Sequence, residues 1–270
     1  EQEGIAIPAQ DWTWDDFFAI VEAVTKDLDG DGAADQYGVC GFGWQQAAYS
    51  NGALFYDEQE NTVCFSDAAM IEAITFLRQL YLVCDQDQVS AQQFDEGLVA
   101  FQPMNYSDYR AYMPYPWRVK KFSGFEWECL PFPRGGSGVN ASAIDTLMVA
   151  MSARSAQPQL AWEFMRYLSG DEAYQQQAAI ISQGVSVLPR VMQDETVTAA
   201  LQEDIPGTSS FDMDVLDTVM HQGIPVRMTQ DEEAIIESAD GAISALVHNQ
   251  QDIENELIRL ERRINAYLKK

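Results

Sequence analysis

Basic residues are scarce in this sequence. Its 270 residues include 16 lysines and arginines against 42 aspartates and glutamates, a formal net charge of -26. Residues 1–100 contain only Lys26 and Arg78 as basic side chains, against nineteen acidic ones. Nucleic acids and anionic lipid surfaces are bound mainly through lysine and arginine, so we expect neither as a partner. Such an acidic surface is typical of proteins that must stay soluble, including those outside the cell.

Long apolar runs are also absent. No stretch of the sequence approaches the ~20 consecutive apolar residues that a membrane-spanning helix needs, so we expect no direct membrane insertion of this segment. Neither a signal peptide nor a lipid-anchor cysteine is visible at the start, and we expect any such segment to have been removed.

Cysteine and histidine are few and scattered, which offers little for catalysis or for structural zinc. The four cysteines stand far apart without close pairs, so disulfides and buried free thiols both remain open: Cys40, Cys64, Cys84 and Cys129. His221 and His248 lie on separate predicted helices with no ligand pattern nearby. Residues 135–138, Gly-Gly-Ser-Gly, lack the lysine of a phosphate loop and the spacing of a nucleophile elbow. We therefore expect no enzyme.

An aspartate-rich loop is the most distinctive local motif. Aspartates occupy positions one, three, five and nine of a run that has glycine at position six, the pattern by which a loop surrounds calcium with oxygen ligands. An EF-hand also needs glutamate at position twelve, where Gly38 stands. The alternative is a solvated turn between a helix and a strand. The predicted ligands of a possible structural Ca²⁺ are Asp27, Asp29, Asp31, the Ala33 carbonyl, Asp35 and Gln36.

Hydrophobic periodicity predicts helices alternating with short strands, which indicates an α/β protein. Thr13 and Asp16 predict a capped first helix whose apolar stripe is Phe17, Ile20, Val21 and Val24. A helix from Pro158 is predicted to bury Ala161, Phe164, Met165 and Leu168. The last helix is predicted over 252–270, with one apolar face formed by Ile253, Leu257, Leu260, Ile264 and Tyr267. Strands are predicted at 36–42, 62–65, 98–102 and 146–151, with a flexible glycine loop at 135–138.

Taken in order, these segments resemble the later two-thirds of a family 1 extracellular solute-binding protein, the maltose-binding-protein-like group that delivers sugars to ABC importers. The resemblance is carried by the order of several motifs, none diagnostic alone: residues 4–8, Gly-Ile-Ala-Ile-Pro; 12–17, Trp-Thr-Trp-Asp-Asp-Phe; 35–38, Asp-Gln-Tyr-Gly; 127–133, Trp-Glu-Cys-Leu-Pro-Phe-Pro; 161–168, Ala-Trp-Glu-Phe-Met-Arg-Tyr-Leu; Gly184 to Pro189; and Ile253, Leu257 and Asn265.

The resemblance implies a fold of the periplasmic-binding-protein type II class, consisting of a C-terminal lobe and part of an N-terminal lobe. Residues 1–128 and 193–270 would form the C-terminal lobe, and 129–192 would return to the N-terminal lobe. Roughly the first hundred residues of the family pattern have no counterpart here, so the N-terminal lobe would lack its opening strands. Either this is a piece of a longer protein, or that part is lost or supplied in trans.

Sugar binding requires flat apolar rings beside planar polar groups, on loops that follow strand ends. Trp44 with Gln45 follows a predicted strand and matches a ligand loop of the family, which favours ligand contact; the alternative is that Trp44 fills the core of its lobe. The complete set of predicted ligand-binding residues is Trp44, Gln45, Asn105, Tyr106, Tyr109, Trp117, Gly184 and Ser186.

The resemblance therefore predicts a non-enzymatic, extracellular or periplasmic subunit that binds a sugar or oligosaccharide and delivers it to the permease subunits of an ABC transporter. The family pattern further implies membrane anchoring through a lipoprotein signal upstream of this sequence. Two rival interpretations stay open: an extracellular carbohydrate-active enzyme, and a calcium-stabilised interaction module that binds no small ligand. The sequence decides neither the solute nor the oligomeric state.

Overall fold

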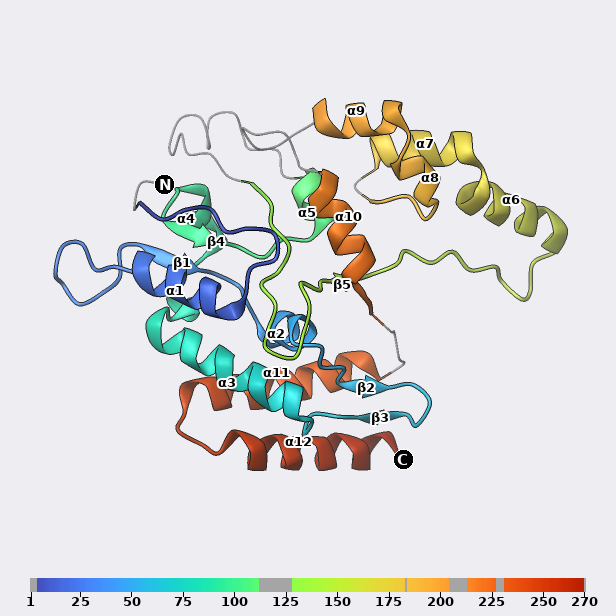
Figure 1. Ribbon diagram of the computed structural model, residues 1–270. Helices are drawn as coiled ribbons and strands as arrows, with labels where there is room; N and C mark the ends of the chain where they lie inside the picture. The colour runs from blue at the N-terminus through green and yellow to red at the C-terminus, as the bar shows by residue number, and fades with distance from the viewer. Residues whose placement is uncertain (1–3, 112–127, 183, 204–212, 227–230, 270) are drawn as a thin grey trace. The chain divides into compact units, whose positions relative to one another are not determined.

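A computed structural model describes residues 4–111, 128–182, 184–203, 213–226 and 231–269 (Figure 1). The chain divides into two compact units. Unit 1 comprises Glu1–Pro103, Leu130–Asp145 and Val215–Lys270, and unit 2 comprises Met104–Cys129 and Thr146–Asp214. This division does not test the predicted lobe boundaries at 128/129 and 192/193, which stay predictions.

Unit 1 opens with helix α1 (Trp14–Val24), whose start is the predicted capping box. The Asp16 amide donates to the Thr13 hydroxyl (3.3 Å), and the Thr13 amide donates to the Asp16 carboxylate (2.9 Å). These bonds satisfy backbone donors that the first turn of a helix leaves unpaired. The buried face of α1 includes Phe17 and Val21, so the predicted cap and apolar stripe are both confirmed.

Three strands of unit 1 lie within the predicted ranges 36–42, 62–65 and 98–102 but are shorter, whereas the other three, at 56–57, 143–144 and 224–225, were not predicted. β1 (Tyr37–Val39) pairs in parallel with β4 (Val99–Phe101), and β2 (Tyr56–Asp57) pairs in antiparallel fashion with β3 (Thr62–Val63). β5 (Ala143–Ile144) pairs in parallel with β6 (Ile224–Pro225). Three short helical segments join these strands to the helices: α2 (Trp44–Ser50), η1 (Gln86–Gln88) and α4 (Ala91–Asp95).

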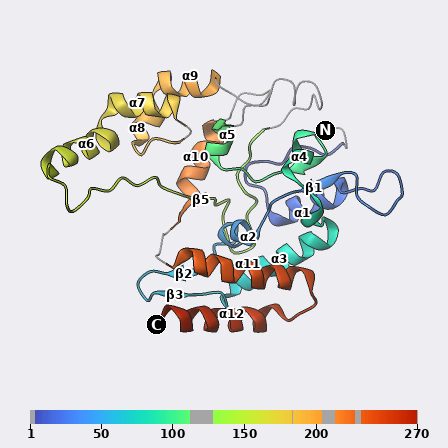
Figure 2. The same ribbon diagram turned by 180° about the vertical axis from the view of Figure 1, so that it is seen from behind.

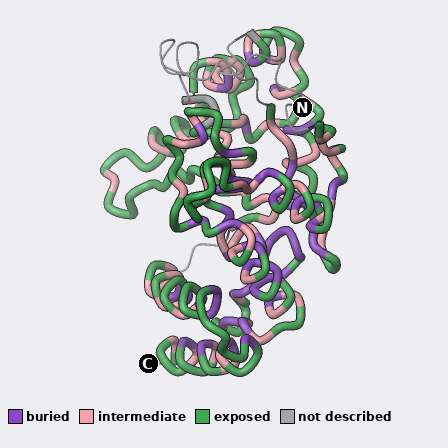
Figure 3. The backbone as a smooth tube through the Cα atoms, turned by 90° about the vertical axis from the view of Figure 1, so that its left-hand side faces the viewer, coloured by how far each residue is buried: buried purple, intermediate pink, exposed green. Residues whose placement is uncertain are grey.

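Three long helices form the largest packed layer of unit 1. α3 (Ala68–Val83), α11 (Glu232–His248) and α12 (Ile253–Leu268) contact one another, with α11 between the other two in both views (Figures 1 and 2). Figure 3 shows helices that alternate between buried and exposed turns, as expected when one face lies on a core. The predicted stripe of the last helix is confirmed at Ile253, Leu257, Leu260 and Ile264, whereas Tyr267 is half exposed.

Polar side chains attach these distant segments at defined positions. The Asn265 amide accepts from the Val63 backbone N–H (2.8 Å) and donates to the Val63 carbonyl (3.0 Å), so it pairs with β3 much as a neighbouring strand would. The Arg78 guanidinium donates to the Leu246 and Gln251 carbonyls at 2.9 and 2.7 Å. It thereby holds the turn between α11 and α12 against α3.

The glycine loop at 135–138 is closely packed, which corrects the expectation of a flexible loop. The Gly135 amide donates to the Ser50 carbonyl (2.9 Å), and the Ser137 amide donates to the side chain of the buried Asn51 (3.0 Å). A Cβ atom on Gly138 would lie 2.0 Å from the Ser50 carbonyl oxygen. Glycine is therefore required by the close approach of two backbones.

Unit 2 is a set of helices with a small core. Its helices are α5 (Tyr106–Ala111), α6 (Pro158–Gly170), α7 (Glu172–Ile181), α8 (Pro189–Met192) and α9 (Glu195–Glu203), and α10 (Met213–Gln222) crosses the boundary into unit 1. The buried core cluster consists of Ala179, Val191, Val197 and Leu201. Four partly buried apolar side chains pack against it: Ile180, Leu188, Met192 and Met213.

Two sequence predictions in unit 2 are wrong. The predicted strand at 146–151 is not formed, since no strand of the described residues includes these positions. α6 forms from Pro158 as predicted but has no buried residue, and Phe164 on its expected inner face is 58% exposed. Both predictions assumed an apolar partner that the described residues do not supply. Leu147, within the predicted strand at 146–151, is likewise an apolar side chain that is left 95% exposed.

None of the described helices is long and apolar enough to cross a membrane. All four cysteines are free thiols, which answers the question that the sequence left open. Burial raises the pKa of Cys40 to about 11 and that of Cys129 to about 12. Both thiols are therefore protonated near neutral pH, and the buried Cys40 behaves as a small core residue.

Candidate functional site

The aspartate loop between α1 and β1 brings three of its carboxylates together. Ligand atoms of Asp27, Asp29 and Asp35 all lie within 4.8 Å of one another, and all three residues are exposed. The ends of the loop are fixed by backbone bonds between Lys26 and Gln36, at 2.9 and 3.2 Å. Asp31, a predicted ligand, lies outside the group and accepts from the Ala33 amide at 2.8 Å.

Backbone amides orient these carboxylates. Asp27 accepts from the Gly30 and Gly32 amides at 2.6 and 2.8 Å, and Asp35 accepts from the Leu28 amide at 2.8 Å. The Gly32 and Gly30 amides hold the pKa of the Asp27 carboxyl below its usual value, because they stabilise the ionised form. The loop therefore presents negatively charged oxygens, the donor type that Ca²⁺ prefers.

Trp44 begins α2 in the interior of unit 1. It is 6% exposed, and its ring centroid lies 5.0 Å from that of Phe55 and 5.7 Å from that of Phe65. Its indole N–H donates to Asp240 on α11 at 2.7 Å. This packing supports the interpretation that Trp44 fills the core; Gln45 beside it is partly exposed. Ligand contact by Trp44 stays a prediction.

The residues that follow β4 lie at the start of unit 2. Asn105 is exposed and donates to the Asp108 carboxylate at 2.9 Å, and Tyr106, partly exposed, is the first residue of α5. Tyr109 lies within α5, and its side chain is outside the described part of the structure. Trp117 also lies outside the described residues.

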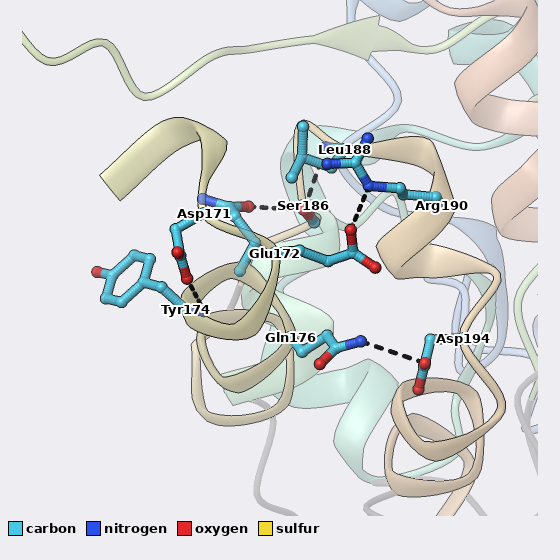
Figure 4. Close-up of polar contacts among 9 residues, drawn as sticks. Asp171, Glu172, Tyr174, Gln176, Ser186, Leu188, Arg190 and Asp194 are labelled. Atoms are coloured by element: carbon cyan, nitrogen blue, oxygen red, sulfur yellow. Dashed lines mark hydrogen bonds and ion pairs between the residues drawn. The ribbon is translucent and has the colours of Figure 1, made fainter. Parts of the chain in front are cut away.

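Ser186 is held in a polar network around α7 and α8 (Figure 4). Its hydroxyl donates to the Gln175 side-chain carbonyl at 2.6 Å and accepts from the Leu188 amide at 3.1 Å. In the same view Arg190 pairs with Glu172 at 2.6 Å. Both hydrogen-bonding capacities of Ser186 thus serve the fold of unit 2, whereas the nearby Gly184 is exposed.

The structure therefore brings together three of the predicted metal ligands but distributes the predicted sugar-binding residues over both units. Trp44 and Gln45 belong to unit 1, and Asn105, Tyr106, Gly184 and Ser186 belong to unit 2. Sequence reasoning missed Asp240, because a partner on α11 cannot be inferred for Trp44 from local pattern. It also judged His248 to have no ligand pattern nearby, whereas Asp85 and Asp87 lie close to it.

The chain belongs to the family described as bacterial extracellular solute-binding protein, whose sequence profile matches residues 4–203. The predicted family resemblance is thus confirmed. The family consists of extracellular binding proteins rather than enzymes. A comparison with curated proteins found no match.

Solved structures share the fold at low sequence identity. An ABC substrate-binding protein from Listeria monocytogenes in complex with cycloalternan is 14% identical to this chain, with a TM-score of 0.70. The match covers 99% of this chain and 66% of the Listeria protein. The cyclic alpha-maltosyl-1,6-maltose binding protein from Arthrobacter globiformis is 15% identical with a TM-score of 0.73, covering 99% and 67%. The maltose/maltodextrin-binding domain MalE from Bdellovibrio bacteriovorus bound to maltotriose is 14% identical with a TM-score of 0.65, covering 100% and 69%.

These likenesses confirm the predicted fold class, that of periplasmic binding proteins of type II. The chain spans about two thirds of the length of the solved structures that it matches, with 66% coverage of the Listeria protein.

Proposed function

We propose that this chain is part of the substrate-binding subunit of an ABC importer that takes a sugar or oligosaccharide. The observation that carries the proposal is the family match over residues 4–203. It is supported by structures of the same fold whose ligands are cycloalternan and maltotriose. The ligand would be held by non-covalent contacts alone, since an importer's binding protein must release its cargo.

The mechanism we propose is closure of two lobes of the whole protein on the ligand. A ligand that binds the closed state more tightly than the open one shifts the population toward closure, and the permease subunits recognise that state. The location would be extracellular or periplasmic, with anchoring by an upstream lipoprotein signal. Candidate contacts are Gln45, Asn105 and Tyr106, each at least partly exposed in its own unit.

We also propose that a further part of the whole protein covers residues 146–151 and α6. A contiguous stretch of unit 2 leaves large apolar side chains in water, which a soluble protein rarely does over so many residues. The exposed members are Leu147, Met148, Val149, Met151, Leu160, Trp162, Phe164 and Tyr167. The matched structures, which are longer than this chain by about a third of their own length, supply a candidate for the cover.

Hydrogen exchange tests this cover. In the 270-residue chain residues 147–151 belong to no helix or strand, so their amides should exchange within about seconds, whereas in the full-length protein a neighbouring strand should slow them at least about 100-fold. Equal exchange in both proteins would contradict the proposal.

Calorimetry on the full-length protein tests the function. Titration with a panel of malto-oligosaccharides and cyclic glucans should give saturable heat with one ligand class, and the same ligand should raise the melting temperature. Tyr106→Ala should weaken that binding more than Tyr56→Ala, which alters a tyrosine on the β2–β3 hairpin. No heat and no thermal shift with any sugar would contradict the proposal, and cleavage of a labelled glycan would favour an enzyme.

The aspartate loop is proposed to bind a structural Ca²⁺ through Asp27, Asp29 and Asp35, whose oxygens converge. Calcium at ten times its Kd should stabilise the protein by about 1.4 kcal/mol. Asp29→Asn, which keeps an acceptor for the Asp31 amide, should abolish this gain. The control is Asp57→Asn, an exposed aspartate that accepts from the Gln59 amide elsewhere in unit 1. A melting temperature equal in calcium and in chelator would exclude the metal.

A further inference from the structure

A second cluster of side chains of the kinds that bind metals lies just beyond the C-terminal end of α3, within unit 1. Asp85 and Asp87 flank the start of η1, and His248 is the last residue of α11. Ligand atoms of the three all lie within 4.8 Å of one another, and all three residues are exposed. The shortest contact joins His248 Nε2 to Asp87 Oδ2 at 3.0 Å.

The surroundings of the His248 ring make this more than a group of carboxylates. Nδ1 lies 2.7 Å from the Ser244 carbonyl one turn earlier in α11, and Nε2 faces Asp87. Both partners are acceptors, and a neutral imidazole carries only one N–H. A carbonyl oxygen can only accept, so Nδ1 carries the proton of that contact, and in a neutral ring the Nε2 lone pair then points into the cluster.

This arrangement is the one in which proteins prepare a histidine to bind a metal. A ligating histidine usually donates its other ring N–H to a carbonyl or carboxylate, which fixes the tautomer and the direction of the ring. The Tyr81 ring packs edge-on against the His248 ring, with centroids 5.4 Å apart. Ring position and tautomer are thus both set by groups outside the cluster.

Tyr81 and the η1 backbone also orient the carboxylates. The Tyr81 hydroxyl hydrogen-bonds to the Asp87 carboxylate. The Asp87 amide donates to Asp85 Oδ1 at 3.2 Å, which leaves the other Asp85 oxygen available.

We propose that Asp85, Asp87 and His248 form a binding site for a divalent transition-metal ion of the zinc class. One imidazole nitrogen with two carboxylates suits Zn²⁺, whereas Ca²⁺ and Mg²⁺ prefer oxygen ligands alone. Two ligand atoms roughly 2.1 Å from a tetrahedral ion lie about 3.4 Å apart, so the 3.0 Å between Nε2 and Oδ2 needs only a small adjustment. A fourth position remains open to water or to an outside ligand.

The site would join the end of α3 to the end of α11, which are contributed by distant parts of the sequence. A metal held only in the folded state stabilises that state by mass action. At Zn²⁺ 100 times its Kd, we expect the melting temperature of the 270-residue chain to rise by about 5 °C.

The test is titration of the chain with ZnCl₂ by calorimetry and thermal shift, with matched histidine variants. His248→Gln should weaken zinc binding at least about tenfold and remove the thermal shift. The control is His221→Gln, which alters the other histidine, also on a helix with Nδ1 near the carbonyl four residues earlier, at 2.9 Å. Tyr81→Phe keeps the ring but removes the hydroxyl, so it should weaken binding about tenfold.

Calcium competition separates this site from the aspartate loop. Excess CaCl₂ should leave the His248-dependent zinc binding unchanged, and Asp29→Asn should leave it unchanged too. Equal zinc isotherms for the parent, His248→Gln and Asp87→Asn would mean that zinc binds only to the acidic surface, and would overturn the proposal. The absence of saturable zinc binding would also overturn it, leaving His248 as a structural partner of Asp87 alone.

Discussion

Unit 1 and unit 2 differ in how completely each encloses its own apolar side chains. In unit 1 the helices α1, α3, α11 and α12 each bury a full stripe, and large side chains such as Phe65, Met70 and Leu257 are wholly inaccessible. In unit 2 the buried cluster consists of one alanine, two valines and one leucine, and α6 buries nothing. Similar sequence patterns thus led to different degrees of burial, because burial depends on a partner and not on the helix alone.

The largest expected difference between the units is the energetic cost of removing a phenylalanine ring. Phe65→Ala in unit 1 should lower the free energy of unfolding by about 3–5 kcal/mol, since its fully buried ring contacts Phe55 and Trp44. Phe164→Ala in unit 2 should change it by less than about 0.5 kcal/mol, since that ring is 58% exposed. Urea unfolding followed by circular dichroism measures both; equal costs would mean that α6 packs on a partner.

A smaller loss of stability is expected for a substitution in the glycine loop, residues 135–138, which packs against Ser50 and Asn51. Gly138→Ala should cost about 1–3 kcal/mol, because the new methyl group meets the Ser50 carbonyl. Gly241→Ala on the exposed side of α11 is the matched control, with no atom within 4 Å of its added Cβ. It should stabilise by about 0.5–1 kcal/mol, since alanine favours helix over glycine. A stabilising Gly138→Ala would show that the loop is loosely packed after all.

The smallest expected contrast concerns helix caps, which act locally in either unit. Thr13→Ala at α1 and Asp171→Ala at α7 should each cost about 1 kcal/mol, because each removes an acceptor for a first-turn amide. Equal losses in the free energy of unfolding, measured by the same urea unfolding, would mean that the two units differ only in how well their apolar side chains pack. A cap in unit 2 that costs nothing would instead mean that α7 is frayed.

The capping box at α1 also makes a pH prediction. Hydrogen bonds from Thr13 hold the pKa of Asp16 below its usual value of 3.8 in the folded state. Its contribution to stability is therefore present above that value and is lost as the pH falls through the lower, folded pKa. Asp16→Asn should lose less stability than the parent between pH 5 and pH 3. The same loss in both proteins would assign the acid sensitivity to other carboxylates.

Local chemistry made part of this fold predictable. The Thr13 cap, the apolar stripe of α12 and the positions of β1 and β4 all follow from short-range spacing, and the structure confirms them. The failures concern segments whose conformation depends on what lies beside them. Residues 146–151 have strand-like composition but form no strand, and the glycine loop is closely packed because Ser50 and Asn51 surround it.

The candidate sites also differ in whether their residues come from one short segment or from distant parts of the chain. The convergence of Asp27, Asp29 and Asp35 was predictable because the three belong to one short loop. The cluster of Asp85, Asp87 and His248 was not, since its histidine comes from another helix far along the chain. Trp44 could be placed after a strand from the sequence, but its enclosure by Phe55 and Phe65 depends on the β2–β3 hairpin folding back.

The alternating segments of the two units have a topological consequence. The backbone passes between them four times, at residues 103/104, 129/130, 145/146 and 214/215, since unit 1 is made of three segments and unit 2 of two. A protease that cuts one of these crossings cannot release either unit, because three covalent tethers remain. Nicked molecules should therefore migrate as intact protein on a sizing column and separate into pieces only in denaturant.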